Sequence, residues 1–313
     1  MMQLISPNTN FDFVGKRQVM IAASLSLAAL SLLLGLIVGP KLGIDFSGGS
    51  LIQVRFDNAT EADAVRKAVG EQMHGADIQN VGRDGREFLI RLPLNEANSE
   101  SVNNTVTTAL GEAFGRDSVE ILRVEAVGPR VGQELRERAI LAVFFSTLMM
   151  GVYIWIRFEW RFGIGAAVAL LHDVILTFGA LVLFGYEFDL NIVAAMLTIV
   201  GFSVNDTVVV SDRIRENRAK DRRAPLAEII NRSVNETLSR TFLTTGTAIM
   251  VVTALFVLGG SVLRGFSFAL LVGFIVGVYS SIYIAAPVVL FFERKAASAK
   301  SEGRPASAAA RRT

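Results

Sequence analysis

The fold class follows from residues 189–210, which read DLNIVAAMLTIVGFSVNDTVVV. A helix needs about 20 mostly apolar residues to cross the hydrocarbon core of a membrane. This stretch is long enough, and Asp206 is the one charged residue between Leu190 and Val210. A carboxylate inside a membrane helix is costly and by default marks a functional position. The stretch therefore predicts a membrane span with a functional acid.

Five other stretches have the same apolar character. The chain has 313 residues, is 51% hydrophobic and carries 31 basic and 29 acidic side chains, which are concentrated between the apolar stretches. The first stretch could instead be a cleaved secretory signal, but Gly39, Pro40 and Lys41 form no small-residue cleavage site, so we expect a retained anchor. We predict spans at 18–38, 138–157, 163–184, 189–210, 240–260 and 266–292.

Basic residues are unevenly divided among the connections between these spans. If the spans alternate in direction, one side of the membrane holds the arginine-rich loop 211–239 and the tail 293–313, whereas the opposite short connections have only Arg264 as a basic residue. The positive-inside rule then places residues 1–17 and the tail in the cytoplasm and residues 39–137 outside. The Ala-, Ser- and Arg-rich tail is expected to be disordered.

The segment 39–137 changes to short strands and amphipathic helices. A helix begins near Thr60, because a Thr followed three residues later by Asp63 is typical of a helix start. The expected order of strand, helix, strand, strand, helix and strand is that of an α+β ferredoxin-like fold. No catalytic group stands out in this domain, so a protein-contacting role is expected. The segments that carry the prediction are 51–56, 88–92, Val102 with Val106 and Leu110, and 119–124.

Asp206 and Arg240 lie at comparable depths, both toward the inner ends of their spans. Thr244 and Thr247 follow Arg240 on the same helix face. Burial favours the protonated carboxyl group and a nearby guanidinium favours the ionised form, so a small helix movement could switch the protonation of Asp206. A carboxylate, a guanidinium and hydroxyls at one depth together predict a proton-binding site. Two alternatives stay open: a static Asp206–Arg240 pair, and an arginine that extends to the membrane surface.

Two further polar features fall inside the spans. His172 and Asp173 lie near the middle of the third span, where a functional role and a structural interhelical contact are equally compatible with the sequence. The sixth span carries small residues that predict close helix packing, namely Gly273, Gly277, Ser280 and Ser281.

The sequence restricts the source of energy. It has no G-x-x-x-x-G-K-[ST] stretch, which excludes a P-loop for ATP. It has no cysteine and only His74 and His172, which excludes thiolate and histidine-rich metal sites. Energy must then come from a partner or an ion gradient, and one proton crossing 100 mV yields about 2.3 kcal/mol.

Two motifs resemble those of a known family. Residues 43–50, GIDFSGGS, are similar to the entry signature of the SecD/SecF family. Residues 205–217, NDTVVVSDRIREN, resemble the fourth-span signature of its SecF branch. The likeness covers nearly all of residues 10–293, with further matches at 239–241, 259–260 and 280–287.

The resemblance implies a six-span half of an RND-type transporter that acts in protein export at the bacterial inner membrane. It implies pairing with SecD, association with the SecYEG channel and often YajC, contact with membrane lipid, and unfolded preproteins as substrates. The proton gradient, or sodium in some members, would supply the energy. No enzymatic turnover, cofactor or nucleic-acid partner is expected.

The same resemblance assigns roles to individual residues. It makes Asp206 the proton-binding carboxylate and Arg240 its partner. Asn205, Asp173 and Thr244 would support them. A tight turn where the first span meets the outer domain would be formed by the motif residues Asp45, Phe46, Gly48 and Gly49, the glycines supplying backbone freedom.

Two other classes of function stay open. One is half of an RND-type exporter of small molecules or lipids, although such exporters usually have twelve spans and two large outer domains in one chain. The other is a sensor or scaffold with passive spans, which would give no reason to bury Asp206 and Arg240 at similar depth.

Overall fold

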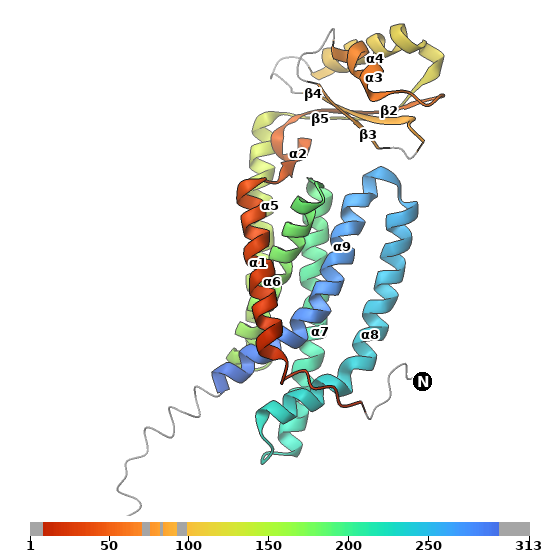
Figure 1. Cartoon of the computed structure of the whole chain (residues 1–313). Coiled ribbons are helices and arrows are strands. Elements are labelled where there is room, and N and C mark those ends of the chain that lie inside the picture. The colour runs from red at the N-terminus through yellow and green to blue at the C-terminus, as the bar shows by residue number, and fades with distance from the viewer. Residues whose placement is uncertain (1–8, 71–75, 82–83, 93–98, 294–313) are drawn as a thin grey trace, which may run out of the picture.

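The structure is a computed structural model that describes residues 9–70, 76–81, 84–92 and 99–293. Within them, six helices are long and apolar enough to cross a membrane. They form a bundle that carries a separate α+β domain at one end (Figure 1). The protein is thus a polytopic helical membrane protein, as predicted. The six helices are α1 Arg17–Ile37, α5 Pro129–Arg157, α6 Trp160–Leu183, α7 Leu190–Lys220, α8 Leu226–Leu258 and α9 Gly260–Ser280.

The last helix does not stop at Ser280. A π-helical turn, η2 (Ser281–Ala285), follows α9 without a break, and the helical span continues to Glu293. The disorder expected for the tail concerns residues 294–313, which lie outside the described residues.

Helices α7 and α8 extend well beyond the predicted spans. Most of the loop expected at 211–239 is helical, because α7 continues to Lys220 and α8 begins at Leu226. Ile214 of α7 and Ile229 of α8 belong to one buried cluster. An amphipathic helical hairpin of this kind is stabilised by its own packing rather than by lipid. The mean hydropathy of a window of residues therefore does not detect it.

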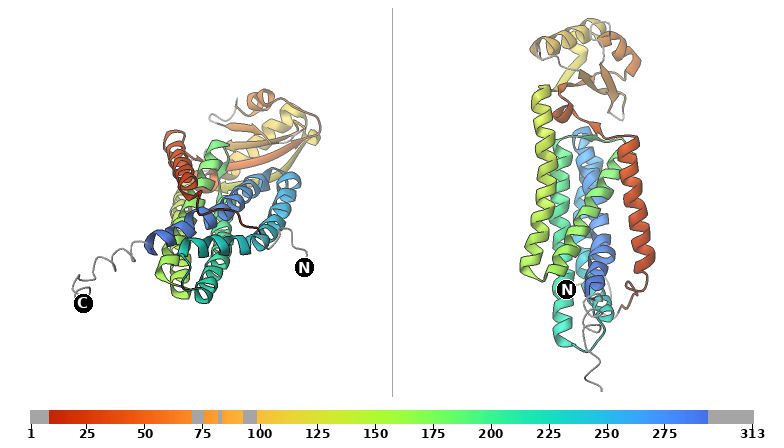
Figure 2. Two further views of the ribbon diagram at one scale, coloured as in Figure 1. Left: turned by 60° about the horizontal axis from the view of Figure 1, so that its bottom comes forward. Right: turned by 90° about the vertical axis from the view of Figure 1, so that its left-hand side faces the viewer.

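Helices α6, α7 and α9 form the centre of the bundle, and α1, α5 and α8 surround them with most of their surface exposed (Figure 2). Small residues permit the central contacts. A Cβ atom on Gly273 would lie 2.3 Å from Cδ1 of Ile199, and one on Gly277 would lie 3.3 Å from Cβ of Ser203. The glycine face of α9 is therefore packed against α7.

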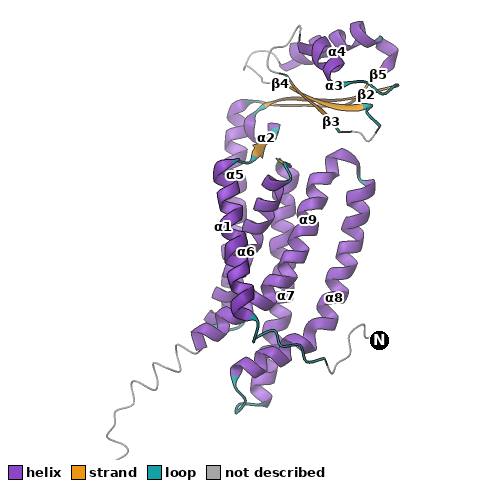
Figure 3. Cartoon of the chain, in the orientation of Figure 1, coloured by secondary structure: helices purple, strands orange, loops and turns teal. Residues whose placement is uncertain are grey.

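The outer domain is a four-stranded antiparallel sheet with two helices on one face (Figure 3). The sheet order β3-β4-β2-β5 is the ferredoxin-like arrangement, as predicted. Ile52 of β2 faces Ile90 of β4, and both side chains lie in the apolar core beneath the helices. The elements are β2 Gly49–Phe56, α3 Ala62–Gly70, β3 Asp77–Asn80, β4 Glu87–Leu92, α4 Ser99–Phe114, the short η1 Arg116–Ser118 and β5 Val119–Val127.

A compact joint connects this domain to the bundle. Strand β1 (Lys41–Leu42) pairs in parallel with β6 (Glu187–Phe188), which lies between α6 and α7. The short helix α2 (Ile44–Ser47) follows β1 and leads into Gly48 and Gly49, and Gly49 is the first residue of β2. Gly48 has φ +73°, and a Cβ atom there would lie 2.7 Å from Cα of Pro129, so a side chain is excluded by conformation and by space.

Candidate ion-translocation site

The outer end of α7 is fixed by two carboxylates. The Asp189 side chain accepts a hydrogen bond from the backbone N–H of Ile192 at 2.8 Å. Asp45 accepts one from the N–H of Leu190 at 2.9 Å. Negative groups at a helix N-terminus satisfy free N–H groups and oppose the positive end of the helix dipole. The motif residue Asp45 therefore ties the joint to the helix that carries Asp206.

Asp206 lies in the middle of α7 with 3% of its surface exposed. Its one hydrogen bond within the described residues is a long one, from the Thr245 hydroxyl of α8 at 3.4 Å. A buried carboxylate normally has several close donors. Asp206 is therefore a weakly bound acid between two helices.

Arg240 does not form the ion pair with Asp206 that the sequence suggested. Its side chain is exposed on α8, and no ion pair joins it to another described residue within 4.0 Å, although its positive charge acts on Asp206 through space. Asn205 is also exposed. The Thr244 hydroxyl donates to the carbonyl of Arg240 at 3.0 Å and does not reach Asp206.

Helix geometry explains this correction. Successive residues are about 100° apart around a helix, so Thr244 and Thr245 point in different directions. Thr241 and Thr245, four residues apart, share the buried face toward α7. Arg240 and Thr244 share the neighbouring face. Hydropathy and spacing do not indicate which face of α8 meets α7, so Thr245 was missed.

Asp173 is the second buried acid, with 1% of its surface exposed. Its Oδ2 atom accepts hydrogen bonds from Ser203 of α7 at 2.6 Å and Ser280 of α9 at 2.8 Å. Its Oδ1 atom lies 3.1 Å from Nδ1 of His172. Three helices therefore meet at this carboxylate, and Ser280, predicted as a packing residue, is also a hydrogen-bond donor.

The network around Asp173 reaches α1. The His172 ring stacks on Tyr279 with centroids 6.1 Å apart. The Tyr279 hydroxyl donates to the carbonyl of Met20 at 2.7 Å and contacts the Ser24 hydroxyl at 2.7 Å. Polar contacts thus run across the bundle from α1 through α9 and α6 to α7.

The polar groups of this site come from four helices, α6, α7, α8 and α9. Across the described part of the chain, no group of three or more His, Cys, Asp or Glu side chains is placed to hold a metal ion. The site offers two carboxylates and several hydroxyls, with Ser203 and Asp206 one turn apart on α7. Fold and site together define a polytopic membrane protein with an outer α+β domain and acids inside its bundle, which is the transporter class.

The comparisons with known proteins give the family. Residues 94–295 match the family described as protein export membrane protein SecD/SecF, C-terminal, and residues 35–60 match the SecD/SecF GG motif. The chain belongs to the SecD/SecF family of protein-export membrane proteins. The GG-motif match includes β1, α2 and the glycines Gly48 and Gly49 of the joint.

Several relatives and solved structures are similar to the chain over most of its length. It is 44% identical to the protein translocase subunit SecF of Magnetococcus marinus over 97% of this chain and all of that one. It is 41% identical to SecF of Vibrio alginolyticus over 93% of this chain and 92% of that one. The crystal structure of SecDF from Thermus thermophilus, a translocon-associated membrane protein, superposes with a TM-score of 0.84 at 38% identity. That match covers 94% of this chain and 40% of the SecDF chain.

Proposed function

We propose that this chain is the SecF-type subunit of the bacterial Sec export machinery and uses the proton gradient to promote preprotein translocation. The observation that carries the proposal is Asp206, a buried carboxylate whose one hydrogen bond within the described part of the chain is a long bond to a neighbouring helix. A carboxylate held this weakly can gain and lose a proton without breaking a network. No covalent catalysis and no cofactor are part of the proposal.

The proposed partner is SecD. Relatives of similar length are named SecF, and the SecDF chain of Thermus contains this fold as 40% of its length. The exposed faces of α1 and α8 leave room for a second half of the transporter. Arg240, exposed on α8, would then lie between the halves. SecYEG and YajC as further partners rest on the family resemblance.

The proposed location is the bacterial inner membrane with both termini in the cytoplasm. The N-terminal segment lies against α8, where the N–H of Phe11 donates to Asn235 at 2.9 Å. This end of the bundle, opposite the outer domain, also holds the last residues of α9 (Figure 1). It carries the arginines of the α7–α8 hairpin, which the positive-inside rule assigns to the cytoplasm.

The mechanism begins with the protonation of Asp206. A proton entering from outside would neutralise the carboxylate and remove its attraction to Arg240. One proton provides about 2.3 kcal/mol per 100 mV, enough to shift α8 relative to α7 between two arrangements. We infer a proton rather than sodium because, within the described residues, the hydroxyl of Thr245 is the one side-chain group within hydrogen-bond reach of Asp206.

The test is Asp206→Asn in inverted membrane vesicles that contain the full chain and SecD. The amide is isosteric but cannot be ionised, so stimulation of preprotein translocation by the proton gradient should be lost while membrane insertion and copurification with SecD are kept. Asp212→Asn is the matched control, because Asp212 lies on the same helix and is exposed. Gradient stimulation that survives in Asp206→Asn would contradict the proposal.

A further inference from the structure

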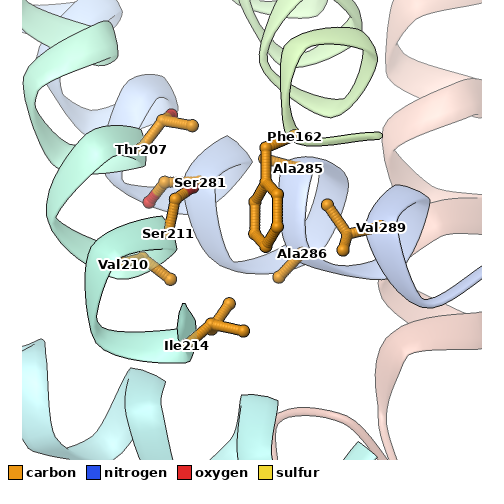
Figure 4. Close-up of a pocket in the computed structure, with 9 residues that line it drawn as sticks. All are labelled: Phe162, Thr207, Val210, Ser211, Ile214, Ser281, Ala285, Ala286 and Val289. Carbon is orange, nitrogen blue, oxygen red and sulfur yellow. The ribbon is translucent and has the colours of Figure 1, made fainter. Parts of the chain in front are cut away.

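A small cavity lies between α7, α6 and the π-helical turn η2, beside the acid sites but separate from them. It has about 10 Å³ of room. Its nine lining residues are all buried. Figure 4 shows three hydroxyl side chains along one side, with Phe162 and apolar groups on the other. The three hydroxyls belong to Thr207, Ser211 and Ser281.

One of these hydroxyls has no partner among the residues that the structure describes. The Oγ1 atom of Thr207 is buried and accepts or donates no hydrogen bond within this part of the chain, and the residue as a whole is 3% exposed. Buried polar atoms are nearly always hydrogen-bonded, and a bare one commonly indicates an ordered water molecule. The cavity next to Thr207 has the size of a single water site.

The spacing along α7 fits a bridging water. Thr207 and Ser211 are four residues apart, which is about 6 Å along a helix. That distance is too long for a direct hydrogen bond. It is about the length of two hydrogen bonds of 2.8 Å placed end to end. A water molecule between the two hydroxyls would therefore reach both of them.

The π-helical turn adds the third group. Ser280 donates to Asp173, and the next residue, Ser281, begins the π turn and lines the cavity. Single π turns inside α-helices are frequent at functional sites. Here the turn places consecutive serines at the acid site and at the cavity.

From these contacts we propose that the cavity binds one water molecule, held by Thr207, Ser211 and Ser281, that joins α7 to the π-helical turn η2. The Thr207 hydroxyl donates to the water, and the water donates to Ser281, whose own hydroxyl proton is already given to the carbonyl of Val278 at 2.9 Å. The lining contains no carboxylate, so a metal cation there would be unpaired, and water fits the site better than sodium.

Radiolytic labelling in ¹⁸O-enriched water tests the site directly, because a bound water molecule labels buried side chains next to it. The full chain with SecD in lipid nanodiscs should show labelling of Phe162 although this ring is only 6% exposed. Thr207→Val, nearly isosteric, should reduce that labelling several-fold. Thr247→Val is the control, because its hydroxyl lies on the exposed side of α8 and is already bonded to its own helix backbone. Ser281→Ala provides a second, smaller change should Thr207→Val fail to fold.

The outcomes distinguish a bound water molecule from sodium and from an empty cavity. No Phe162 labelling, or labelling unchanged in both variants, overturns the water site. Labelling that falls when NaCl replaces choline chloride at equal ionic strength shows that sodium occupies the cavity. That result overturns the water site as well. Labelling of Phe162 that falls in Thr207→Val and stays unchanged in Thr247→Val supports the water site. Gradient stimulation that persists in Asp206→Asn is a failure of the proposed function alone and leaves the water site unaffected.

Discussion

Asp173 and Asp206 are both buried carboxylates on adjacent helices, yet their surroundings differ. Asp173 has three polar partners from its own helix and two others, at 2.6 to 3.1 Å. Among the described residues, Asp206 has one donor, at 3.4 Å. A fully bonded carboxylate is expensive to disturb, because every donor around it would lose its partner. A weakly bonded one can change its charge at little structural cost. The comparison suggests that Asp173 holds the helices in register while Asp206 carries the working proton.

The largest expected effect is a loss of stability when Asp173 is replaced. Asp173→Ala removes three hydrogen bonds, and such bonds contribute about 0.6 kcal/mol each in membrane bundles, so the free energy of unfolding should fall by about 2 kcal/mol. Equilibrium unfolding in mixed micelles measures this loss. Asp206→Ala is the paired variant and should cost about 0.6 kcal/mol or less. Equal losses in the free energy of unfolding at the two positions would contradict the distinction between a fully bonded Asp173 and a weakly bonded Asp206.

The next effect concerns Arg240. Arg240→Lys keeps the positive charge but loses the planar, multiply donating guanidinium. Gradient-stimulated translocation should fall about tenfold, which corresponds to one charge-assisted hydrogen bond of about 1.5 kcal/mol. Unfolding should be unchanged, because the side chain is exposed and unpaired within the described chain. Full activity would mean that Arg240 only extends to the membrane surface.

A smaller effect separates two neighbouring threonines. Thr245→Val removes the hydroxyl that contacts Asp206, and a bond of about 0.6 kcal/mol corresponds to a change of about threefold in gradient stimulation. Thr244→Val removes a hydroxyl that bonds only the backbone of α8, and activity should be kept. The translocation rate in vesicles at fixed gradient distinguishes them. A larger loss in the Thr244 variant would show that the α8 face is assigned incorrectly.

The smallest effect is expected in the loop between α6, which carries Asp173, and α7, which carries Asp206. Glu187 pairs with Arg91 of the outer domain and accepts from Gln79 at 3.2 Å. Glu187→Gln should weaken this attachment by about 0.5 kcal/mol. Hydrogen exchange at the amides of Gly43 and Leu190 should then become about twofold faster. Glu120→Gln is the control, since that carboxylate is 66% exposed and lies 3.9 Å from Arg55. Equal exchange in both variants would exclude a role for Glu187 in the joint.

Much of the architecture could be predicted from the sequence. The apolar stretch that contains Asp206 and its five counterparts predicted a membrane bundle, because hydrocarbon requires long uncharged helices. Alternation in segments such as 51–56 and 88–92 predicted the sheet of the outer domain, because side chains of a strand point alternately to its two faces. The helical extensions of α7 and α8 were missed, because they are stabilised by each other.

The site was predicted less completely than the fold. Asp206 and Asp173 were identified as candidates because charge in a membrane is rare. Their partners were not, because hydrogen bonds depend on which helix faces meet. Ser203 and Thr245 are ordinary residues in the sequence and become partners of the acids only when α6, α8 and α9 pack against α7.

By itself, the sequence determined that this protein crosses the membrane six times, carries an outer domain after the first span and buries two acids in its spans. These properties depend on composition and local periodicity, which a linear chain contains in full. Only the tertiary structure decided that Asp173 is fully bonded, that Asp206 is held by Thr245 rather than Arg240, and that Thr207 faces a small cavity. Those properties depend on helix rotation and depth, which are fixed by the packing of residues far apart in the chain.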